Sequence, residues 1–267
     1  MSAVRVAVAG AGGRMGRALL EAATSTPGLT LGAALDMAGS PWAGRDAGDL
    51  ASGAKGTAIG TDVAQVLGAC DVLVDFTRPE GTLAHVRACR AAGKAMVIGT
   101  TGFAAAGIDE IRAAAKDIAI VMAPNMSIGV TVMAKLVELA SRTLGPDYDA
   151  EVFEIHHSKK VDAPSGTALM LGSVASKARG GSIDKDGVHA RHGQTGERKS
   201  GSVGFSVARG GDVVGDHTVY FAGTGERIEI THRANSRATY AQGAMRAARF
   251  AASHPAGLYG MNDVLGL

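Results

Sequence analysis

The chain has 267 residues, of which 46% are hydrophobic and 19% are charged, and its formal net charge is +2 at pH 7. A chain of this length can bury a substantial core, and we expect two domains. The small positive charge and the aromatic content of 4% argue against a dedicated nucleic-acid binder, which needs a strongly basic surface and stacking side chains. A small anionic ligand is compatible with this composition.

Cysteine content and hydropathy narrow the protein class further. Cys70 and Cys89 are the only cysteines, and their number and spacing suit neither a disulfide framework nor a structural zinc site, so we expect reduced thiols in core or helix-facing positions. No basic segment followed by a signal-type apolar run begins the sequence, and its apolar stretches are shorter than the ~20 residues of a membrane span. These patterns predict a cytoplasmic protein without membrane or nucleic-acid partners.

The first half of the chain alternates short apolar runs with helical patterns. Helical spacing of apolar residues is found at 14–23, 79–93 and 108–117. The apolar runs that predict buried strands lie at 4–10, 29–36, 71–76, 95–99 and 118–124. This alternation favours an α/β domain with a Rossmann-like, doubly wound parallel sheet, whose ligands bind at the carboxyl ends of the strands.

A glycine-rich turn, GAGGRMG at residues 10–16, follows the first predicted strand and opens the first predicted helix. In this context the turn indicates dinucleotide binding, because bare amides at a helix start hold a pyrophosphate. Asp36 follows Gly16 by twenty residues, where a carboxylate accepts hydrogen bonds from adenosine ribose hydroxyls. The alternative for Asp36 is a solvated turn residue, and Arg14 fits a surface position as well as a phosphate contact.

Three further predicted strands end in polar motifs: FTRP at 76–79, GTTG at 99–102 and APNMS at 123–127. Each motif lies where an open α/β sheet binds its ligand. Gly, Pro, Thr and Asn are also the ordinary composition of a turn after any strand. The motifs are therefore candidate ligand loops.

The second half of the chain has a different order of predicted elements. A long helical pattern at 127–145 precedes an alternating strand at 149–157, a loop rich in Gly, Lys, Arg and His at 180–200, and strands at 202–210, 216–223 and 226–234. Strands in series predict a second α+β domain built on a mixed or antiparallel sheet. An Ala-rich helix at 238–252 can return to the first domain. We therefore expect a dinucleotide-binding domain of residues 1–126 plus 238–267, and a substrate-binding and oligomerisation domain of residues 127–237.

Residues 154–169, EIHHSKKVDAPSGTAL, concentrate the reactive side chains of the chain. A helical pattern begins near position 166, so Ser165 or Gly166 is the expected N-cap, and the amides of Ser165, Gly166 and Thr167 would form an anion site. Just before this helix start come groups that can bind a second carboxylate and transfer protons near neutral pH: His156, His157 and Lys160.

Other interpretations of this stretch remain open. Adjacent histidines at a strand end point to opposite faces, so one of them can be structural. A metal site needs a third ligand that the spacing does not offer, and we expect no metal. Lys159 and Lys160 also fit a solvated pair of charges, and Asp162 fits a role in fixing the loop.

Five motifs, in the order GAGGRMG, DFTRP, GTTG, APNMS and HHSKKVDAPSGTA, resemble the dihydrodipicolinate reductases of bacterial lysine biosynthesis, now called 4-hydroxy-tetrahydrodipicolinate reductases. The resemblance covers nearly the full length, and the histidine-lysine-DAPSGT motif is its most specific part. It implies hydride transfer from NAD(P)H to the cyclic dicarboxylate 4-hydroxy-tetrahydrodipicolinate, with loss of water, in the diaminopimelate route to lysine. It also implies a homotetramer formed through the sheet of the second domain.

The resemblance also implies a role for each matching position. His156 matches the proton donor or acceptor of the family, and Lys160 matches its second proton donor. The positions that match substrate contacts are His157, Ser165, Gly166, Thr167 and Arg237. The positions that match cofactor contacts are Gly10, Ala11, Gly12, Gly13, Arg14, Met15, Asp36, Gly99, Thr100, Thr101, Ala123, Pro124, Asn125 and Met126. Met37 stands where family members that use NADPH well often carry arginine, so we expect NADH to be preferred over NADPH.

Three alternative functions remain open on the sequence alone. A nicotinamide-dependent reductase of another imine or amino acid would share this architecture, and a substrate panel separates the two. A non-catalytic NADH sensor needs the glycine turn and Asp36 but has no use for Lys160 or the capped anion site. A weak nucleic-acid binder using residues 177–199 would lose affinity steeply with salt.

Overall fold

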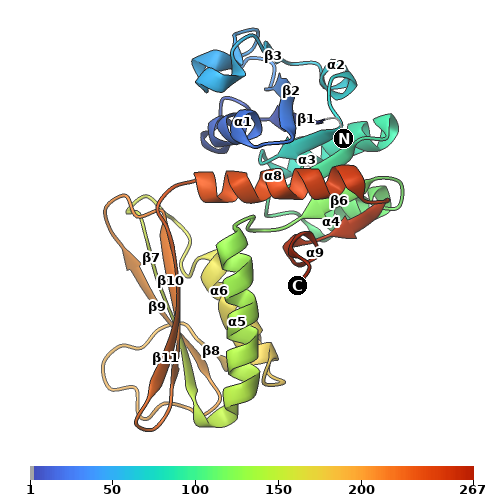
Figure 1. Ribbon diagram of the computed structural model, residues 1–267. Coiled ribbons are helices and arrows are strands. Elements are labelled where there is room, and N and C mark those ends of the chain that lie inside the picture. The colour runs from blue at the N-terminus through green and yellow to red at the C-terminus, as the bar shows by residue number, and fades with distance from the viewer. Residues whose placement is uncertain (1–2) are drawn as a thin grey trace. The chain divides into compact units, whose positions relative to one another are not determined.

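The computed structural model describes residues 3–267, which form two compact units (Figure 1). The first unit comprises the chain up to Ile128 together with Arg237–Leu267, and the second unit comprises Gly129–Ser236. The chain thus crosses between the units after Ile128 and after Ser236, whereas the boundaries expected from the sequence follow residues 126 and 237.

A parallel sheet of seven strands forms the centre of the first unit, in the order β12-β6-β5-β4-β1-β2-β3. The five predicted strands are confirmed, and two further strands lie at the edges of the sheet. The strands are β1 (Val4–Ala9), β2 (Leu29–Leu35), β3 (Ile59–Gly60), β4 (Val72–Asp75), β5 (Ala95–Ile98), β6 (Ala119–Met122) and β12 (Gly257–Tyr259).

Helices cover both faces of this sheet. Successive residues of β1 alternate between two apolar clusters, one on each face. Val6 and Val8 belong to the cluster that contains residues of α1 (Arg14–Ser25) and α8 (Ala238–Ser253), whereas Ala7 and Ala9 belong to the opposite cluster. The opposite cluster includes residues of α2 (Val63–Gly68), α3 (Pro79–Ala92) and α4 (Ala105–Ala114). The doubly wound arrangement and the return of the last long helix to this unit are therefore confirmed.

The remaining segments of the first unit are short. Two 3₁₀ turns between β2 and β3 span Ala47–Asp49 and Ser52–Ala54, and α9 (Met261–Leu265) follows β12. Cys70 and Cys89 are buried free thiols in the core, as expected. Burial raises the pKa of both thiols, that of Cys70 to about 11, so both are unreactive at neutral pH.

The second unit is built on a mixed sheet of five strands in the order β11-β10-β7-β9-β8, which confirms the sequence prediction. Strand β10 pairs antiparallel with β11 and with the central strand β7, while β9 pairs parallel with β7 and β8. The strands are β7 (Asp149–His156), β8 (Gly187–Val188), β9 (Val203–Arg209), β10 (Gly215–Ala222) and β11 (Arg227–Ala234).

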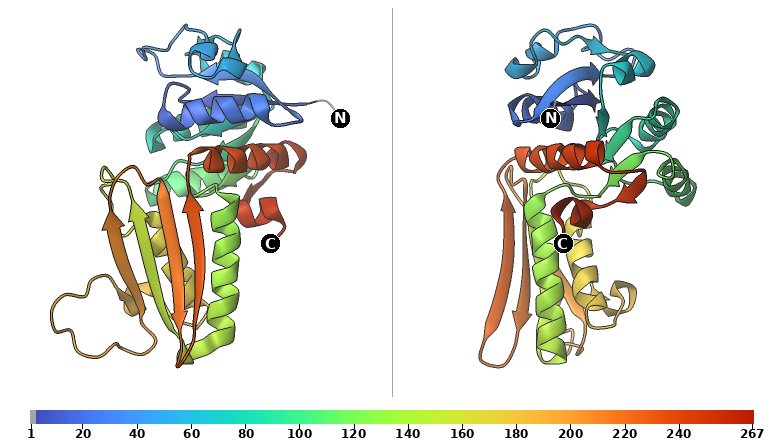
Figure 2. Two further views of the ribbon diagram at one scale, coloured as in Figure 1. Left: turned by 60° about the vertical axis from the view of Figure 1, so that its left-hand side comes forward. Right: turned by 45° about the vertical axis from the view of Figure 1, so that its right-hand side comes forward.

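Helices α5 (Ile128–Leu144) and α6 (Gly166–Lys177) pack on one face of this sheet around Val152, Leu171 and Phe221. No helix of residues 3–267 lies on the other face (Figure 2). Because β7 alternates, Glu154 and His156 lie on the same covered face as Val152. A 3₁₀ turn at Gly145–Asp147 joins α5 to β7, and the expected loop at 180–200 contains the short helix α7 (Ile183–Asp186) and strand β8.

Candidate active site

The glycine turn joins β1 to α1 in a conformation that needs glycine. Gly10 has a φ of 70°, and a Cβ on Gly16 would lie 2.1 Å from the carbonyl oxygen of Gly10. Gly13 precedes α1, and no side chain among the described residues caps this helix start. The start of α1 therefore has no side-chain cap from residues 3–267, which fits a site for the pyrophosphate of a dinucleotide.

Asp36 follows β2 and lies against the glycine turn. Its Oδ2 accepts hydrogen bonds from the Gly12 amide at 2.9 Å and from the Ser40 hydroxyl at 3.1 Å, and its Oδ1 accepts one from the Met37 amide at 2.8 Å. The fold thus brings the predicted acid to the predicted turn. A carboxylate offers about four acceptor positions, so these three donors leave room for about one ribose hydroxyl.

A buried polar network holds the ends of β4 and β5, where FTRP and GTTG begin. Asp75 is fully buried, accepts hydrogen bonds from the hydroxyls of Thr77 at 2.7 Å and Thr82 at 3.1 Å, and lies 2.6 Å from Nδ1 of His85. Burial acts to raise the pKa of Asp75, but its hydrogen bonds and the charge of His85 outweigh burial and lower it. Sequence reasoning assigned no role to Asp75.

Thr100 belongs to this network. Its hydroxyl accepts a hydrogen bond from Thr82 at 2.8 Å and the side chain is buried, whereas Thr101 is exposed. A nicotinamide contact from Thr100 would thus have to come from its backbone. In the APNMS segment after β6, the side-chain oxygen of Asn125 accepts from the Ser127 amide at 2.8 Å, which fixes a tight turn.

The reactive side chains of the second unit gather around Glu154, a buried carboxylate on β7. Arg209 donates to both oxygens, at 2.8 Å to Oε2 and 3.0 Å to Oε1, and the Ser165 amide donates to Oε1 at 3.0 Å. Nδ1 of His156 lies 2.5 Å from Oε2. Burial acts to raise the pKa of Glu154, but the hydrogen bonds from Arg209, His156 and Ser165 outweigh burial and keep it ionised.

The ionised Glu154 fixes the state of His156. Because the carboxylate only accepts hydrogen bonds, Nδ1 of His156 carries a proton and Nε2 is left for a substrate. The pKa of His156 is lowered, because burial, the largest cause, acts together with the charges of Lys160 and Arg209 against the opposing effect of Glu154. His156 is therefore a neutral, oriented imidazole near pH 7. Glu154 could have been identified from the sequence as the partner of His156, because residues two positions apart on a strand lie on the same face.

His217 on β10 supports the start of α6. Its Nε2 lies 3.0 Å from the hydroxyl of Ser165, and that hydroxyl oxygen also accepts from the Ala168 amide at 3.1 Å as the N-cap of α6. The rings of His217 and His156 meet edge to face, with centroids 5.0 Å apart. Burial lowers the pKa of His217 to about 4, so it is neutral as well.

Lys160 adds a positive charge to this cluster. Its Nζ lies 2.8 Å from Oδ1 of Asp162, and its charge contributes to the lowered pKa of His156. Asp162 also accepts a hydrogen bond from Arg209 through its carbonyl at 2.7 Å, in keeping with a role in fixing the loop.

The anion site at the start of α6 differs in one respect from the expectation. Ser165 is the N-cap, but its amide donates to Glu154 and not to a ligand. Gly166, the first residue of the helix, is exposed. His157 is half-buried, and its backbone amide donates to the carbonyl of Val213 at 2.7 Å. Arg237 belongs to the first unit, next to the crossing, and its substrate contact stays a prediction.

Residues 3–267 contain neither a cluster of His, Cys, Asp and Glu suited to a metal ion nor a membrane-spanning helix. No three His, Cys, Asp or Glu side chains within this range are grouped so that they could hold a metal ion. None of the helices in the same range combines the length and the apolar character that a membrane span requires.

The two units together define a class of protein. A glycine turn beside an acid at the end of the second strand is typical of the nucleotide site of a Rossmann-type oxidoreductase. The Glu154 cluster supplies a neutral histidine and a lysine beside a helix start, which makes it a candidate acid–base site for an anionic substrate. The chain is thus a two-unit, dinucleotide-dependent reductase.

Comparison with known proteins identifies the family. Residues 4–126 match the N-terminal model and residues 129–265 the C-terminal model of dihydrodipicolinate reductase. The 4-hydroxy-tetrahydrodipicolinate reductase of Nitrosospira multiformis is 57% identical over 267 residues, which is 100% of this chain and 99% of that protein. The reductase of the same name from Bordetella pertussis is 57% identical over 98% of this chain and 97% of that protein. The chain therefore belongs to the dihydrodipicolinate reductase family.

A solved structure agrees with this assignment at the level of the fold. The dipicolinate-bound dihydrodipicolinate reductase from Paenisporosarcina sp. TG-14 has a TM-score of 0.76 and 24% sequence identity, and the match covers 98% of this chain and 99% of that one. Membership of the family makes the chain an oxidoreductase that uses NAD(P)H.

Proposed function

We propose that the protein reduces 4-hydroxy-tetrahydrodipicolinate to tetrahydrodipicolinate, with loss of water, in the diaminopimelate route to lysine. The observation that carries this proposal is the Glu154 cluster, in which a neutral histidine, a lysine and a helix start lie together in a chain of this family. The first unit binds the dinucleotide, and the second unit binds the substrate.

The residues of the first unit fit the cofactor. Amides at the start of α1 hold the pyrophosphate, and Asp36 accepts a ribose hydroxyl. When bound, the nicotinamide supplies the hydride that adds to C4 of the substrate ring. The network of Asp75, Thr82 and Thr100 keeps the loop after β5 in place beside it.

The second unit orients the substrate through its two carboxylates. Gly166 and Thr167 at the start of α6 bind one carboxylate through the positive end of the helix, and His157 contacts the other. Because these contacts are equally strong in the ground state and the transition state, His157→Ala and Thr167→Ala should raise KM more than they lower kcat.

His156 and Lys160 move the protons. Neutral His156 removes a proton from the carbon next to C4 through Nε2, while Lys160 protonates the departing C4 hydroxyl, so that the C–O bond breaks and water leaves. After the hydride has added to C4, the imidazolium of His156 returns its proton to the same carbon. Glu154 stabilises that imidazolium through Nδ1, and Lys160 regains its proton from solvent.

We infer a modest preference for NADH. A 2′-phosphate would lie close to the negative charge of Asp36, and Met37, which is 73% exposed, cannot offset that charge. Because the carboxylate has room for about one ribose hydroxyl, the preference should be about 3- to 30-fold in kcat/KM. Met37→Arg should shift it toward NADPH, and a wild-type enzyme that clearly favours NADPH would contradict this assignment of Asp36.

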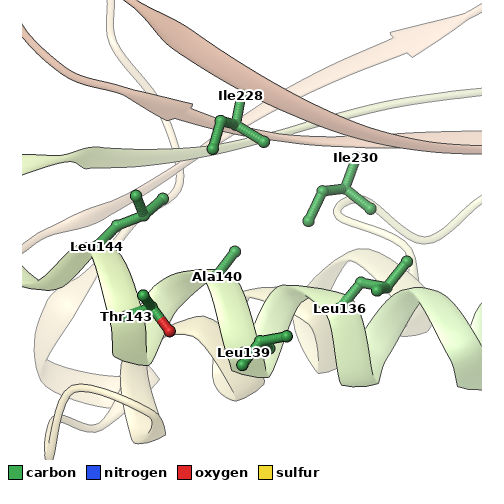
Figure 3. A pocket seen from close by; sticks show the side chains of 7 residues that line it. All are labelled: Leu136, Leu139, Ala140, Thr143, Leu144, Ile228 and Ile230. Atoms are coloured by element: carbon green, nitrogen blue, oxygen red, sulfur yellow. The ribbon is translucent and has the colours of Figure 1, made fainter.

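We also infer that the protein is a cytoplasmic homotetramer that assembles through the second unit. An apolar groove lies between α5 and β11, lined by Leu136, Leu139, Ala140, Thr143, Leu144, Ile228 and Ile230 (Figure 3). Leu139 is 53% exposed and Ile228 is 42% exposed, and Phe153 lies on the face of the sheet that no helix of residues 3–267 covers. These exposed apolar side chains, on both sides of the sheet, favour contact with other copies of the chain. Sedimentation equilibrium should give four times the mass of the chain.

The decisive experiment is NADH oxidation with substrate freshly made by the preceding synthase reaction, followed at 340 nm, with other cyclic imines and amino acids as a panel. We expect turnover with this substrate and none with the panel. A protein that binds NADH but turns over no substrate would instead be a sensor, and turnover of another imine would assign a different reductase.

A further inference from the structure

The loop after β2 carries an indole that stands against the glycine turn. A Cβ placed on Gly12 would lie 2.4 Å from Cδ1 of Trp42 and 2.7 Å from Oδ2 of Asp36. Ser40 links the Asp36 carboxylate to the backbone of Trp42, because its hydroxyl donates to Asp36 at 3.1 Å and accepts from the Trp42 amide at 3.3 Å. Trp42 and Asp36 therefore meet at the same point of the turn.

Two guanidinium groups lie on this indole. The Cζ atoms of Arg17 and Arg45 are 5.2 and 4.9 Å from the ring centroid of Trp42, within the range of cation–π attraction. Arg17 also donates through Nε to the carbonyl of Gly12 at 3.4 Å. Arg45 is 54% exposed and pairs with Asp49 at 3.2 Å. Trp42, which stands against the glycine turn, thus carries two positively charged groups on its ring.

We propose that Arg17 and Arg45, held on Trp42, bind the 2′-phosphate of NADPH and so determine how well this chain uses that cofactor. This inference rests on the use of NAD(P)H proposed above and names the residues that set the balance between NADH and NADPH. Arg17 and Arg45 supply the positive charge that Met37 does not provide.

The chemistry of the three side chains fits a phosphate. Guanidinium groups offer planar pairs of N–H donors that match phosphate oxygens, so the two arginines offset part of the repulsion from Asp36 and keep the preference for NADH modest. The Arg45–Asp49 pair is half-exposed and therefore weak, so Arg45 can exchange Asp49 for a phosphate at little cost. Trp42 limits the motion of both arginines, which lowers the entropy lost on binding.

Trp42 is the only tryptophan of the chain, so its fluorescence reports binding at this point directly. Adenosine 2′,5′-bisphosphate and 5′-AMP differ by the 2′-phosphate alone and serve as probes on the wild type, Arg17→Gln and Arg45→Gln. Each arginine variant should bind the bisphosphate about 5- to 30-fold more weakly and AMP within about 2-fold of wild type, as expected for the loss of a charged hydrogen bond.

Two controls separate this effect from general changes in charge or packing. Arg112 is 63% exposed and pairs with Asp109 at 3.1 Å on α4, so Arg112→Gln removes a comparable charge from the same unit and should change neither affinity. Trp42→Leu, followed by calorimetry, should weaken bisphosphate binding as the arginine variants do, because it removes the surface that positions them.

The outcomes distinguish this inference from the proposed function. Equal losses for both probes, or no loss for either in Arg17→Gln and Arg45→Gln, would overturn the inference while leaving dinucleotide binding intact. Failure of the wild type to bind either probe would overturn both proposals. A loss confined to the bisphosphate supports both.

Discussion

His217 gives a stability prediction whose size follows from its burial. In the unfolded chain a histidine binds a proton below its ordinary pKa of 6.5, whereas buried His217 binds one only below about 4. The groups that face it are His156, Glu154, His232 and Lys160. Between these two pKa values the unfolded state binds more protons, so His217 reduces stability as the pH falls through this window and has no effect above it. Linkage gives a loss of about 2 kcal/mol between pH 7.5 and pH 5.

The assay must report on the second unit alone, because the two units can unfold separately. Hydrogen exchange of peptides from β7 and β10, corrected for the intrinsic pH dependence of exchange, gives the free energy of opening of this unit at pH 7.5 and pH 5. In His217→Gln, whose amide can still bond Ser165, the acid-induced loss should be about 2 kcal/mol smaller than in the wild type. His192→Gln, which alters an exposed histidine of the same unit, should keep the wild-type loss. Equal losses in His217→Gln and wild type would refute the reasoning.

Three further predictions concern the reaction. Lys160→Ala and His156→Ala should each lower kcat at least ~100-fold with unchanged NADH affinity, since general acids and bases contribute about 10²–10⁴-fold, and unchanged turnover would remove the residue from the mechanism. Glu154→Gln should lower kcat and change its pH profile, because the imidazolium of His156 loses its carboxylate, and a profile identical to wild type would reduce Glu154 to a structural role. Small-angle scattering with NADH and pyridine-2,6-dicarboxylate together should show closure about residues 126–130 and 235–240, and identical curves with and without ligands would exclude it.

The strands and helices that could be predicted are those long enough for their apolar residues to show a regular spacing. The five inner strands of the first sheet and the long helices follow from apolar runs and helical spacing. The edge strands β3 and β12 have two and three residues, too few to show a period, and their pairing comes from the sheet beside them. The short α7 and β8 were missed for the same reason, within a segment whose composition is that of a loop.

The site was predictable only in its local part. The motif at 154–169 placed His156, Lys160 and the start of α6 together, because they are neighbours in the chain. Arg209 and His217 come from other strands, and the pairs His156 with Arg209 and Glu154 with His217 exist only through strand register. A shift of one residue would turn these side chains to the other face, and no local pattern specifies that register.

The charges of the cluster lead to a last prediction. In the free protein the negative charges of Glu154 and Asp162 are balanced by Arg209 and Lys160, and His156 is neutral because burial lowers its pKa. A bound dicarboxylate adds negative charge beside His156, and a nearby anion favours the protonated imidazole. The pKa of His156 should therefore be higher in the substrate complex than in the free enzyme, which suits a group that must take up a proton and return it. The acid limb of kcat, which reports the complex, should then lie at higher pH than that of kcat/KM, which reports the free enzyme. Coincident limbs, or a kcat limb at lower pH, would show that the substrate carboxylates bind away from His156.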